Sequence, residues 1–318
     1  MPTQILLLVF GFLLLIKGAT WLVDGATALA QRYNVSNLTI GLTVVAFGTS
    51  APELAVNAFA SLFNHQDIVF GNVIGSNNFN LFLILGIVGL ITPLTVQSST
   101  VWKEIPFSFL AIIILALLVN DFIFANLNEL SRIDGLILLI MFFMFLYYVY
   151  RQLKKDQTEA IIVESSFTSI KIIIYIVLGL ASLIIGGIIA VDNASKLALT
   201  LGVSEKIVGL TIVAAGTSLP ELTTSVVAAL KKNNDIAVGN IIGSNIFNIF
   251  LILSVSSIIR PIPYDLRFNT DLLMLAGGTL FLFIAMFTGH RKKLDRWEAA
   301  ILLLTFIAYT SFLIIQEI

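Results

Sequence analysis

The chain has 318 residues, of which 58% are hydrophobic and 12% are charged, and its formal net charge is −1. Soluble domains carry about 25% charged residues, so the composition excludes an ordinary soluble protein and predicts a chain that crosses a membrane several times. The absence of cysteine from the sequence excludes disulfides and thiolate metal sites.

Apolar segments of membrane-spanning length follow one another along the whole chain. The expected spans cover residues 4–30, 38–62, 69–92, 104–120, 131–150, 168–199, 207–230, 236–259, 269–288 and 297–316. The longest polar stretch, residues 151–167, is too short to bury a core and is expected to be a hydrophilic linker. The sequence therefore predicts an all-α integral membrane protein of ten helices, with one five-helix unit in residues 1–150 and another in residues 168–318.

The second expected span contains a polar motif. Its sequence, GLTVVAFGTSAPEL (residues 41–54), holds Thr49, Ser50 and Glu53, with Pro52 beside the glutamate. An ionisable residue at membrane depth is costly and marks a candidate functional site. A proline there frees backbone carbonyls, which is tolerated where protein or a water-filled cavity satisfies them. The motif predicts a broken helix that presents hydroxyls, a carboxylate and carbonyls to a cation.

The same motif returns 168 residues later as GLTIVAAGTSLPEL (residues 209–222), which contains Thr217, Ser218 and Glu221. Residues 41–85 and 209–253 share 27 identical residues in 45 positions without a gap. Chance similarity between two apolar helices would not keep polar residues in register, so the two halves are internal repeats.

The distribution of Lys and Arg predicts how the repeats are oriented. Twelve of these residues lie in or beside the odd-numbered loops and four in or beside the even-numbered ones. Cytoplasmic loops carry the excess, so both termini are expected outside the cell and the linker in the cytoplasm. Five spans per half is an odd number, so the second repeat enters the membrane inverted. Inverted repeats with interrupted helices are typical of secondary transporters whose site lies near the midplane.

A second polar stretch follows each motif by one helix. Asn72, Ser76 and Asn80 are spaced four residues apart and share one helix face. Their counterparts in the second half are Asn240, Ser244 and Asn248. Carboxylate, hydroxyl and amide oxygens without His or Cys suit hard cations such as Ca²⁺, Mg²⁺ or Na⁺. Two glutamates balance one divalent or two monovalent cations, so competing cations would exchange at such a site.

Other roles remain open for several of these residues. The Thr and Ser of the two motifs can satisfy backbone groups freed by proline, and the polar residues of the second stretch can join helices. The structural and ligand interpretations are equally favoured for four asparagines, since they cannot all face one site: Asn72, Asn77, Asn240 and Asn245. For Asp24 and Asp192 an interfacial or helix-pairing role is favoured over ion ligation, and Lys17 is a candidate partner of Asp24.

The doubled motifs, GTSAPE…GNVIGSNNFN and GTSLPE…GNIIGSNIFN, resemble the two α-repeats of the calcium/cation antiporter (CaCA) superfamily, specifically prokaryotic sodium/calcium exchangers. The resemblance covers the whole chain. It implies electrogenic exchange of Na⁺ for Ca²⁺ across the plasma membrane by alternating access, normally extruding calcium, with the first and sixth helices sliding across the other eight. It also implies neither enzyme activity nor a prosthetic group. The expected partners are the two ions and the lipid bilayer, without nucleic acid or an obligate protein partner.

The resemblance also implies a set of ligands by position. The expected ligands are the carboxylates of Glu53 and Glu221, the hydroxyls of Thr49, Ser50, Ser76, Thr217, Ser218 and Ser244, the amides of Asn80 and Asn248, and the carbonyls of Ala46 and Ala214 at the outer sodium positions. Certain archaeal and potassium-dependent relatives have an aspartate where this chain has Asn248. Potassium co-transport is therefore not expected.

Three other functions compete with sodium/calcium exchange. A nearby alternative is antiport of H⁺ against Ca²⁺ or another divalent cation, with the two glutamates carrying protons, although the adjacent hydroxyls favour a metal ion. An intramembrane enzyme is disfavoured because the spans lack His and Cys and show no nucleophile–base pair. A passive cation channel would differ by showing no saturable counter-transport.

Overall fold

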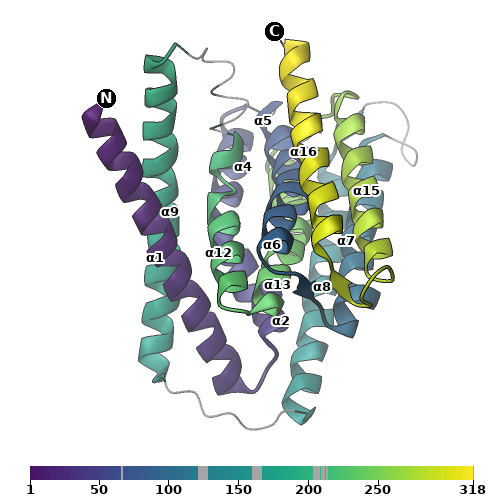
Figure 1. Cartoon of the computed structure of the whole chain (residues 1–318). Helices are drawn as coiled ribbons and strands as arrows, with labels where there is room; N and C mark the ends of the chain where they lie inside the picture. Colours follow the sequence, from purple (N-terminus) through teal and green to yellow (C-terminus); the bar gives the residue numbers. More distant parts are fainter. Residues whose placement is uncertain are drawn as a thin grey trace.

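The computed structural model describes residues 1–65, 67–120, 128–159, 167–202, 208, 212 and 214–317, and these residues are almost entirely helical (Figure 1). In the first half the elements are α1 (Pro2–Tyr33), α2 (Asn37–Ile40), η1 (Gly41–Val45), α3 (Ala46–Thr49), α4 (Ala51–Leu62), α5 (Asp67–Asn78), η2 (Phe79–Ile84), α6 (Leu85–Ile91), β1 (Leu94–Thr95), η3 (Thr100–Glu104), α7 (Ile105–Val119), β2 (Glu129–Leu130) and α8 (Arg132–Glu159), where η denotes a π-helical segment. In the second half they are α9 (Ser169–Thr200), α11 (Ala214–Gly216), α12 (Leu219–Leu230), α13 (Asn234–Phe247), η5 (Asn248–Ile252), α14 (Leu253–Ile259), β3 (Ile262–Pro263), α15 (Phe268–Ala285), β4 (Lys293–Leu294) and α16 (Arg296–Glu317).

Eight helical segments in the described part of the chain are long and apolar enough to cross a membrane. A ninth candidate is the pair Asn37–Thr49 and Ala51–Leu62, whose two parts are bent by 45°. Helix α12 is a shorter apolar helix. Residues 207, 209–211 and 213 of the seventh expected span, with the start of its motif, lie outside the described residues. The all-helical, multi-pass prediction is confirmed, and the total of ten spans stays a prediction.

Helix α13 forms the centre of the molecule. Every residue from Ile236 to Phe247 in this helix is buried. Helices α1 and α9 lie together at one side (Figure 1), and their outer faces expose large apolar residues such as Leu6 and Ile188. An apolar outer face and a polar-containing interior are what a bilayer-embedded helical protein requires.

Glycines bring α1 and α9 into close contact. A Cβ atom added at Gly18 would lie 2.8 Å from the carbonyl oxygen of Gly179, and one added at Gly186 would lie 2.8 Å from that of Gly11. Both distances are too short for a side chain. The absence of side chains at these crossing points therefore lets the two backbones approach directly, as small residues do between membrane helices.

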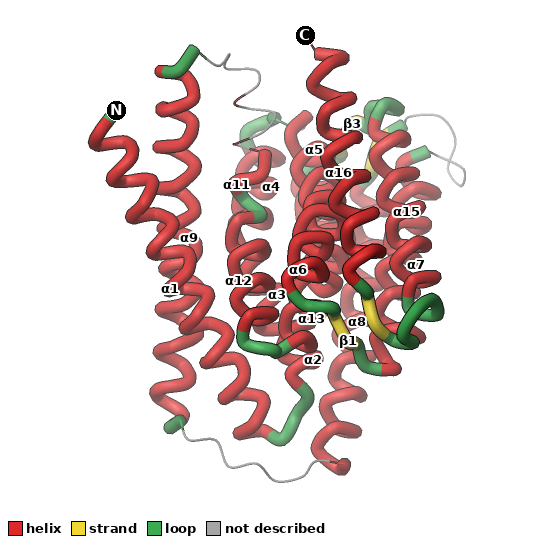
Figure 2. The backbone as a smooth tube through the Cα atoms, viewed as in Figure 1, coloured by secondary structure: helices red, strands yellow, loops and turns green. Residues whose placement is uncertain are grey.

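Two short antiparallel sheets join the halves. In one, Leu94 of β1 pairs with Leu294 of β4, and in the other Leu130 of β2 pairs with Ile262 of β3. The sheets lie at opposite ends of the helices (Figure 2). Each sheet takes one strand from each half, so the halves are held together at both ends of the molecule.

Asp24 connects α1 to the end of α12. Its Oδ1 atom lies 2.6 Å from Nζ of Lys231, which agrees with the predicted helix-pairing role. The proposed partner Lys17 was wrong, because its ammonium group lies over the ring of Trp21 at 5.4 Å. Asp192, the equivalent residue of α9, instead bonds to Lys196 one turn later in the same helix at 2.7 Å.

Candidate cation-binding site

Two helix breaks position the site. Ser50 separates α3 from α4 with φ −83° and ψ 3°, and Ser218 separates α11 from α12 with φ −89° and ψ 4°. Pro52 and Pro220 lie in the first turn of the helix after each break, where the missing backbone N–H costs no helical hydrogen bond. The predicted broken helix is thereby confirmed in the first half, and the described part of the second half repeats the break.

The two glutamates lie in these first turns and are almost completely buried, with 1% exposure each. Ser50 Oγ donates to Glu221 Oε1 at 3.0 Å, and Ser218 Oγ donates to Glu53 Oε1 at 3.3 Å. A helix N-terminus also favours negative charge at this position. Each serine therefore bonds to the carboxylate of the other half, and Glu53 and Glu221 belong to one cluster, as predicted.

Ser76 and Ser244 complete the hydroxyl groups of this cluster. The hydroxyls of Ser76 and Ser218 are 3.1 Å apart, and Ser244 Oγ donates to Glu221 Oε1 at 3.5 Å. Both serines are buried. Helix α13 thus brings its serine to Glu221, and helix α5 brings its serine to Ser218, which bonds to Glu53.

The two threonine hydroxyls donate to asparagines of the other half. Thr49 Oγ1 donates to Asn240 Oδ1 at 2.9 Å, and Thr217 Oγ1 donates to Asn72 Oδ1 at 3.2 Å. Because a hydroxyl has one hydrogen and two acceptor lone pairs, these bonds leave the lone pairs available to a cation. For Asn72 and Asn240 both a structural and a ligand role were open. Each accepts a hydrogen bond from a threonine that is a candidate ligand, which favours the structural role.

Asn80 and Asn248 are buried at the ends of the two polar faces. Asn80 Nδ2 donates to Asn245 Oδ1 at 3.1 Å, and Asn248 Nδ2 donates to Asn77 Oδ1 at 2.9 Å. Each amide therefore uses its nitrogen to bond to an asparagine of the other half, and its oxygen is left for another interaction.

Four oxygens of the expected ligands are buried and accept no hydrogen bond from any described residue. They are Oε2 of Glu53, Oε2 of Glu221, Oδ1 of Asn80 and Oδ1 of Asn248. A buried polar atom without a partner costs about 1–3 kcal/mol, and a charged one costs more. Carboxylate and amide oxygens are the ligands of hard cations, so a cation among these atoms would remove the cost. Two oxygens come from each half.

The two carbonyls expected at outer positions are less fully described. The Ala46 oxygen accepts the Ser50 N–H at 3.0 Å and lies 3.4 Å from the Thr49 hydroxyl oxygen, so it lies directly beside the break. Ala214 begins α11, and residues 209–211 and 213 before it lie outside the described part of the chain.

Comparisons with known proteins identify the family to which the chain belongs. The sequence model of the family described as sodium/calcium exchanger protein matches residues 3–151 and 171–315. The chain belongs to the sodium/calcium exchanger family. Its relatives include the sodium/calcium exchanger MaX1 of Methanosarcina acetivorans, which is 32% identical over 96% of this chain and 97% of that protein, and the inner membrane protein YrbG of Escherichia coli K12, which is 36% identical over 83% of each.

The solved structures of the sodium-calcium exchanger NCX_Mj have the same fold. One of them, from crystals soaked with Na⁺ and Sr²⁺, superposes with a TM-score of 0.82 at 33% identity and covers 97% of this chain and 98% of that one. As a family member, the chain is a multi-pass membrane antiporter and not an enzyme. The ions of this exchanger family are Na⁺ and Ca²⁺.

Two residues that hold the backbone at the glutamates, directly or through Asn240, were not predicted from the sequence. Asn57 Nδ2 donates to the backbone oxygen of Glu53 at 2.7 Å. At the equivalent position of the second half, Ser225 Oγ accepts from Asn240 Nδ2 at 3.0 Å. Both lie four residues after a glutamate and share its helix face, which was the available indication in the sequence.

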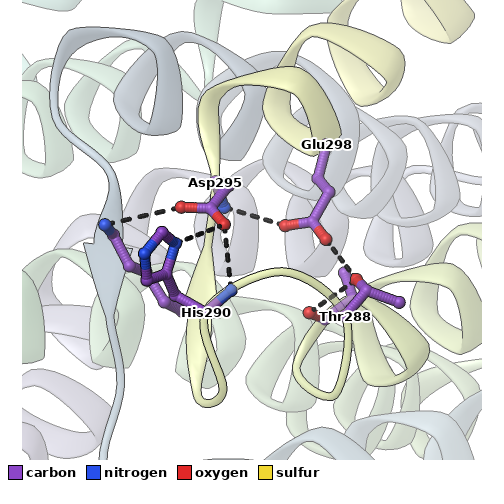
Figure 3. Close-up of polar contacts among 6 residues, drawn as sticks. Thr288, His290, Asp295 and Glu298 are labelled. Atoms are coloured by element: carbon purple, nitrogen blue, oxygen red, sulfur yellow. Dashed lines mark hydrogen bonds and ion pairs between the residues drawn. The ribbon is translucent and has the colours of Figure 1, made fainter.

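A second group of ionisable side chains, between α15 and α16, has a structural role (Figure 3). The Asp295 N–H donates to Glu298 Oε2 at 2.8 Å, and Glu298 also contacts the Thr288 hydroxyl. The His290 backbone N–H holds the pKa of the Asp295 carboxyl below its ordinary value. Ser131 and Asp134 make the same N-terminal contact at α8, at 2.8 Å. These carboxylates cap helices, and their oxygens are occupied by protein donors.

Proposed function

We propose that this chain exchanges Na⁺ for Ca²⁺ across the plasma membrane by alternating access and normally extrudes calcium from the cell. The observation that carries the proposal is the set of four buried oxygens without hydrogen-bond partners, from Glu53, Glu221, Asn80 and Asn248. Family membership supports the two ions as substrates.

The ligand set is proposed in full as the family resemblance implied it. The two glutamates are the central carboxylates, six hydroxyls and two amides complete the cage, and two carbonyls serve outer sodium positions. The hydroxyl ligands are Thr49, Ser50, Ser76, Thr217, Ser218 and Ser244, and the carbonyls are those of Ala46 and Ala214. Contacts between the halves support this assignment, because Ser50 and Ser218 each bond to the opposite glutamate.

Charge balance explains why binding of the two ions would be mutually exclusive. Two carboxylates at low dielectric repel each other strongly without a counter-ion. One Ca²⁺ neutralises both, and so do two Na⁺ ions. A site with two negative charges therefore cannot hold a full load of both ions, and one ion leaves as the other binds.

The proposed architecture is two inverted five-helix repeats with both termini outside the cell and residues 151–167 in the cytoplasm. The reciprocal contacts between equivalent residues and the two short sheets at opposite ends of the molecule support the inversion. Alternating access then follows if α1 and α9 move together against the remaining helices, which their direct glycine contacts favour.

Calcium uptake into proteoliposomes tests the function. Vesicles containing the purified protein are loaded with Na⁺ and diluted into sodium-free buffer with radioactive calcium. We expect saturable uptake that does not require K⁺ and disappears in Glu53→Gln and Glu221→Gln proteins, whereas Glu129→Gln, a change in β2 away from the site, transports normally. Uptake driven by a pH gradient alone, without sodium, would instead favour the H⁺/Ca²⁺ alternative, and full uptake by either site variant would refute the assigned roles.

A further inference from the structure

Two asparagines beside the proposed ligands form a reciprocal pair between the halves. Asn77 in α5 and Asn245 in α13 occupy equivalent positions of the two repeats, and both are buried. Asn77 Nδ2 donates to the backbone oxygen of Asn245 at 3.2 Å. Asn245 Nδ2 donates to the backbone oxygen of Asn77 at 3.4 Å. Each side chain therefore bonds to the main chain of the other half.

These backbone contacts fix which end of each amide faces which neighbour. A backbone carbonyl can only accept a hydrogen bond, so each asparagine must turn its NH₂ group toward it. The Oδ1 atoms of Asn77 and Asn245 consequently point the other way. That orientation is set by the main chain, which cannot exchange donor for acceptor by rotating.

The fixed oxygens determine in turn how the next amides are oriented. Oδ1 of Asn245 accepts from Asn80 Nδ2 at 3.1 Å, and Oδ1 of Asn77 accepts from Asn248 Nδ2 at 2.9 Å. Because an amide oxygen only accepts, Asn80 and Asn248 must offer nitrogen to it. Their own oxygens are then turned away, and these are two of the four buried oxygens without a partner.

We propose that Asn77 and Asn245 are positioning residues that make Asn248 and Asn80, respectively, present oxygen rather than NH₂ to the transported cation. The inference rests on the proposed function. A reversed amide would direct partly positive hydrogens at the ion and remove one ligand. In metal sites, residues that hydrogen-bond to the ligands orient them, and loss of such a residue lowers metal affinity or activity by about 10–100-fold.

A double-mutant cycle tests orientation separately from packing. Leucine has nearly the shape of asparagine and no polar atoms, so Asn77→Leu removes the acceptor that orients Asn248. We expect the KM for calcium in sodium-driven uptake to rise by about 10–100-fold, with a smaller change in the maximum rate. Aspartate at position 248 offers oxygen on both sides, so in the Asn248→Asp background the same leucine substitution should not raise KM.

Asn78→Leu is the matched control. Asn78 is the next buried asparagine, and its Nδ2 donates to the backbone oxygen of Asp271 at 3.3 Å, away from the site. This variant should leave KM unchanged in both backgrounds. If the Asn77 variant is not monodisperse in size-exclusion chromatography, the equivalent cycle of Asn245→Leu with Asn80→Asp makes the same comparison.

Two results would overturn the assignment. An unchanged KM in the single leucine variant would show that nothing needs to orient the ligand amide. An equal rise in both backgrounds would show that Asn77 acts through packing alone. The same assay distinguishes this outcome from failure of the proposed function. If the unmodified protein shows no sodium-driven calcium uptake, the exchange function itself is rejected.

Discussion

Thr49 shows how a neutral side chain is prepared to bind a cation. Its hydroxyl donates to Asn240 Oδ1, and Asn240 is itself held because its Nδ2 donates to Ser225 Oγ at 3.0 Å and to the backbone oxygen of Glu221 at 3.3 Å. The hydroxyl hydrogen is therefore committed before any ion arrives. Its lone pairs are then available without reorganisation of the site.

A prediction at the scale of the residue follows for Thr49→Val, which replaces the hydroxyl by a methyl group of similar size. Losing one neutral ligand of about 0.5–1.5 kcal/mol should raise the KM for calcium by about two- to tenfold, as measured by sodium-driven uptake. Thr43→Val is the control, because the Thr43 hydroxyl donates to the Thr39 backbone oxygen in the same span at 2.7 Å. Equal KM values for the Thr49 variant and the unmodified protein would contradict the ligand role.

Residue types and spacing were sufficient to predict some of the site. Glu53 and Glu221 stood out because charge is costly in a membrane, and Pro52 indicated the bend. The roles of Asn77 and Asn245 were not predictable, because an amide's orientation depends on partners in the other half. The pairing of Lys17 with Asp24 was wrong for a similar reason: spacing along one helix carries no information about Lys231, 207 residues away.

At the scale of the element, the two longest helices are equivalent in sequence and different in their contacts. Near the end of α1, Ala28 and Ala30 are buried at 5% and 2% exposure, whereas Leu199 near the end of α9 is 41% exposed. Thr27 of α1 also accepts a hydrogen bond from Asn233 Nδ2 at 3.0 Å. The region around Thr27 to Ala30 of α1 is therefore held against the body of the protein, whereas the side chain of Leu199 in α9 is exposed.

Cross-linking tests whether α1 must leave this position during transport. The natural chain has no cysteine, so Thr27→Cys and Asn233→Cys together give one defined pair. Joining them with a short reducible cross-linker should stop sodium-driven calcium uptake, because α1 could no longer exchange its packed state with α9, and reduction should restore it.

The matched control joins two elements that are expected to remain stationary during transport. Asn120 Nδ2 donates to Asn269 Oδ1 at 3.0 Å, which links the end of α7 to α15. The cross-linked Asn120→Cys, Asn269→Cys protein should still transport. Uptake that continues while α1 is fixed to residue 233 would rule out movement of α1 as a step of the cycle.

At the scale of the whole molecule, neither half contains a complete site. Ser50 and Ser218 each donate to the glutamate of the other half. The oriented amides also bond across the halves, and the short sheets join the halves at both ends. The internal repeat made this arrangement predictable from the sequence. The different exposure of side chains near the ends of α1 and α9 was not predictable. The two segments occupy equivalent positions of the repeats, and their sequences do not show which one packs against the body of the protein.

The most direct test of a shared cation site is anomalous X-ray scattering from crystals of the protein soaked with Sr²⁺, a heavier hard cation with the oxygen preference of Ca²⁺. We predict a strong anomalous peak between the carboxylates of Glu53 and Glu221, within coordination distance of the Asn80 and Asn248 oxygens, and its loss in Glu53→Gln crystals. Strontium bound elsewhere in the membrane region, with no density between the two glutamates, would contradict it.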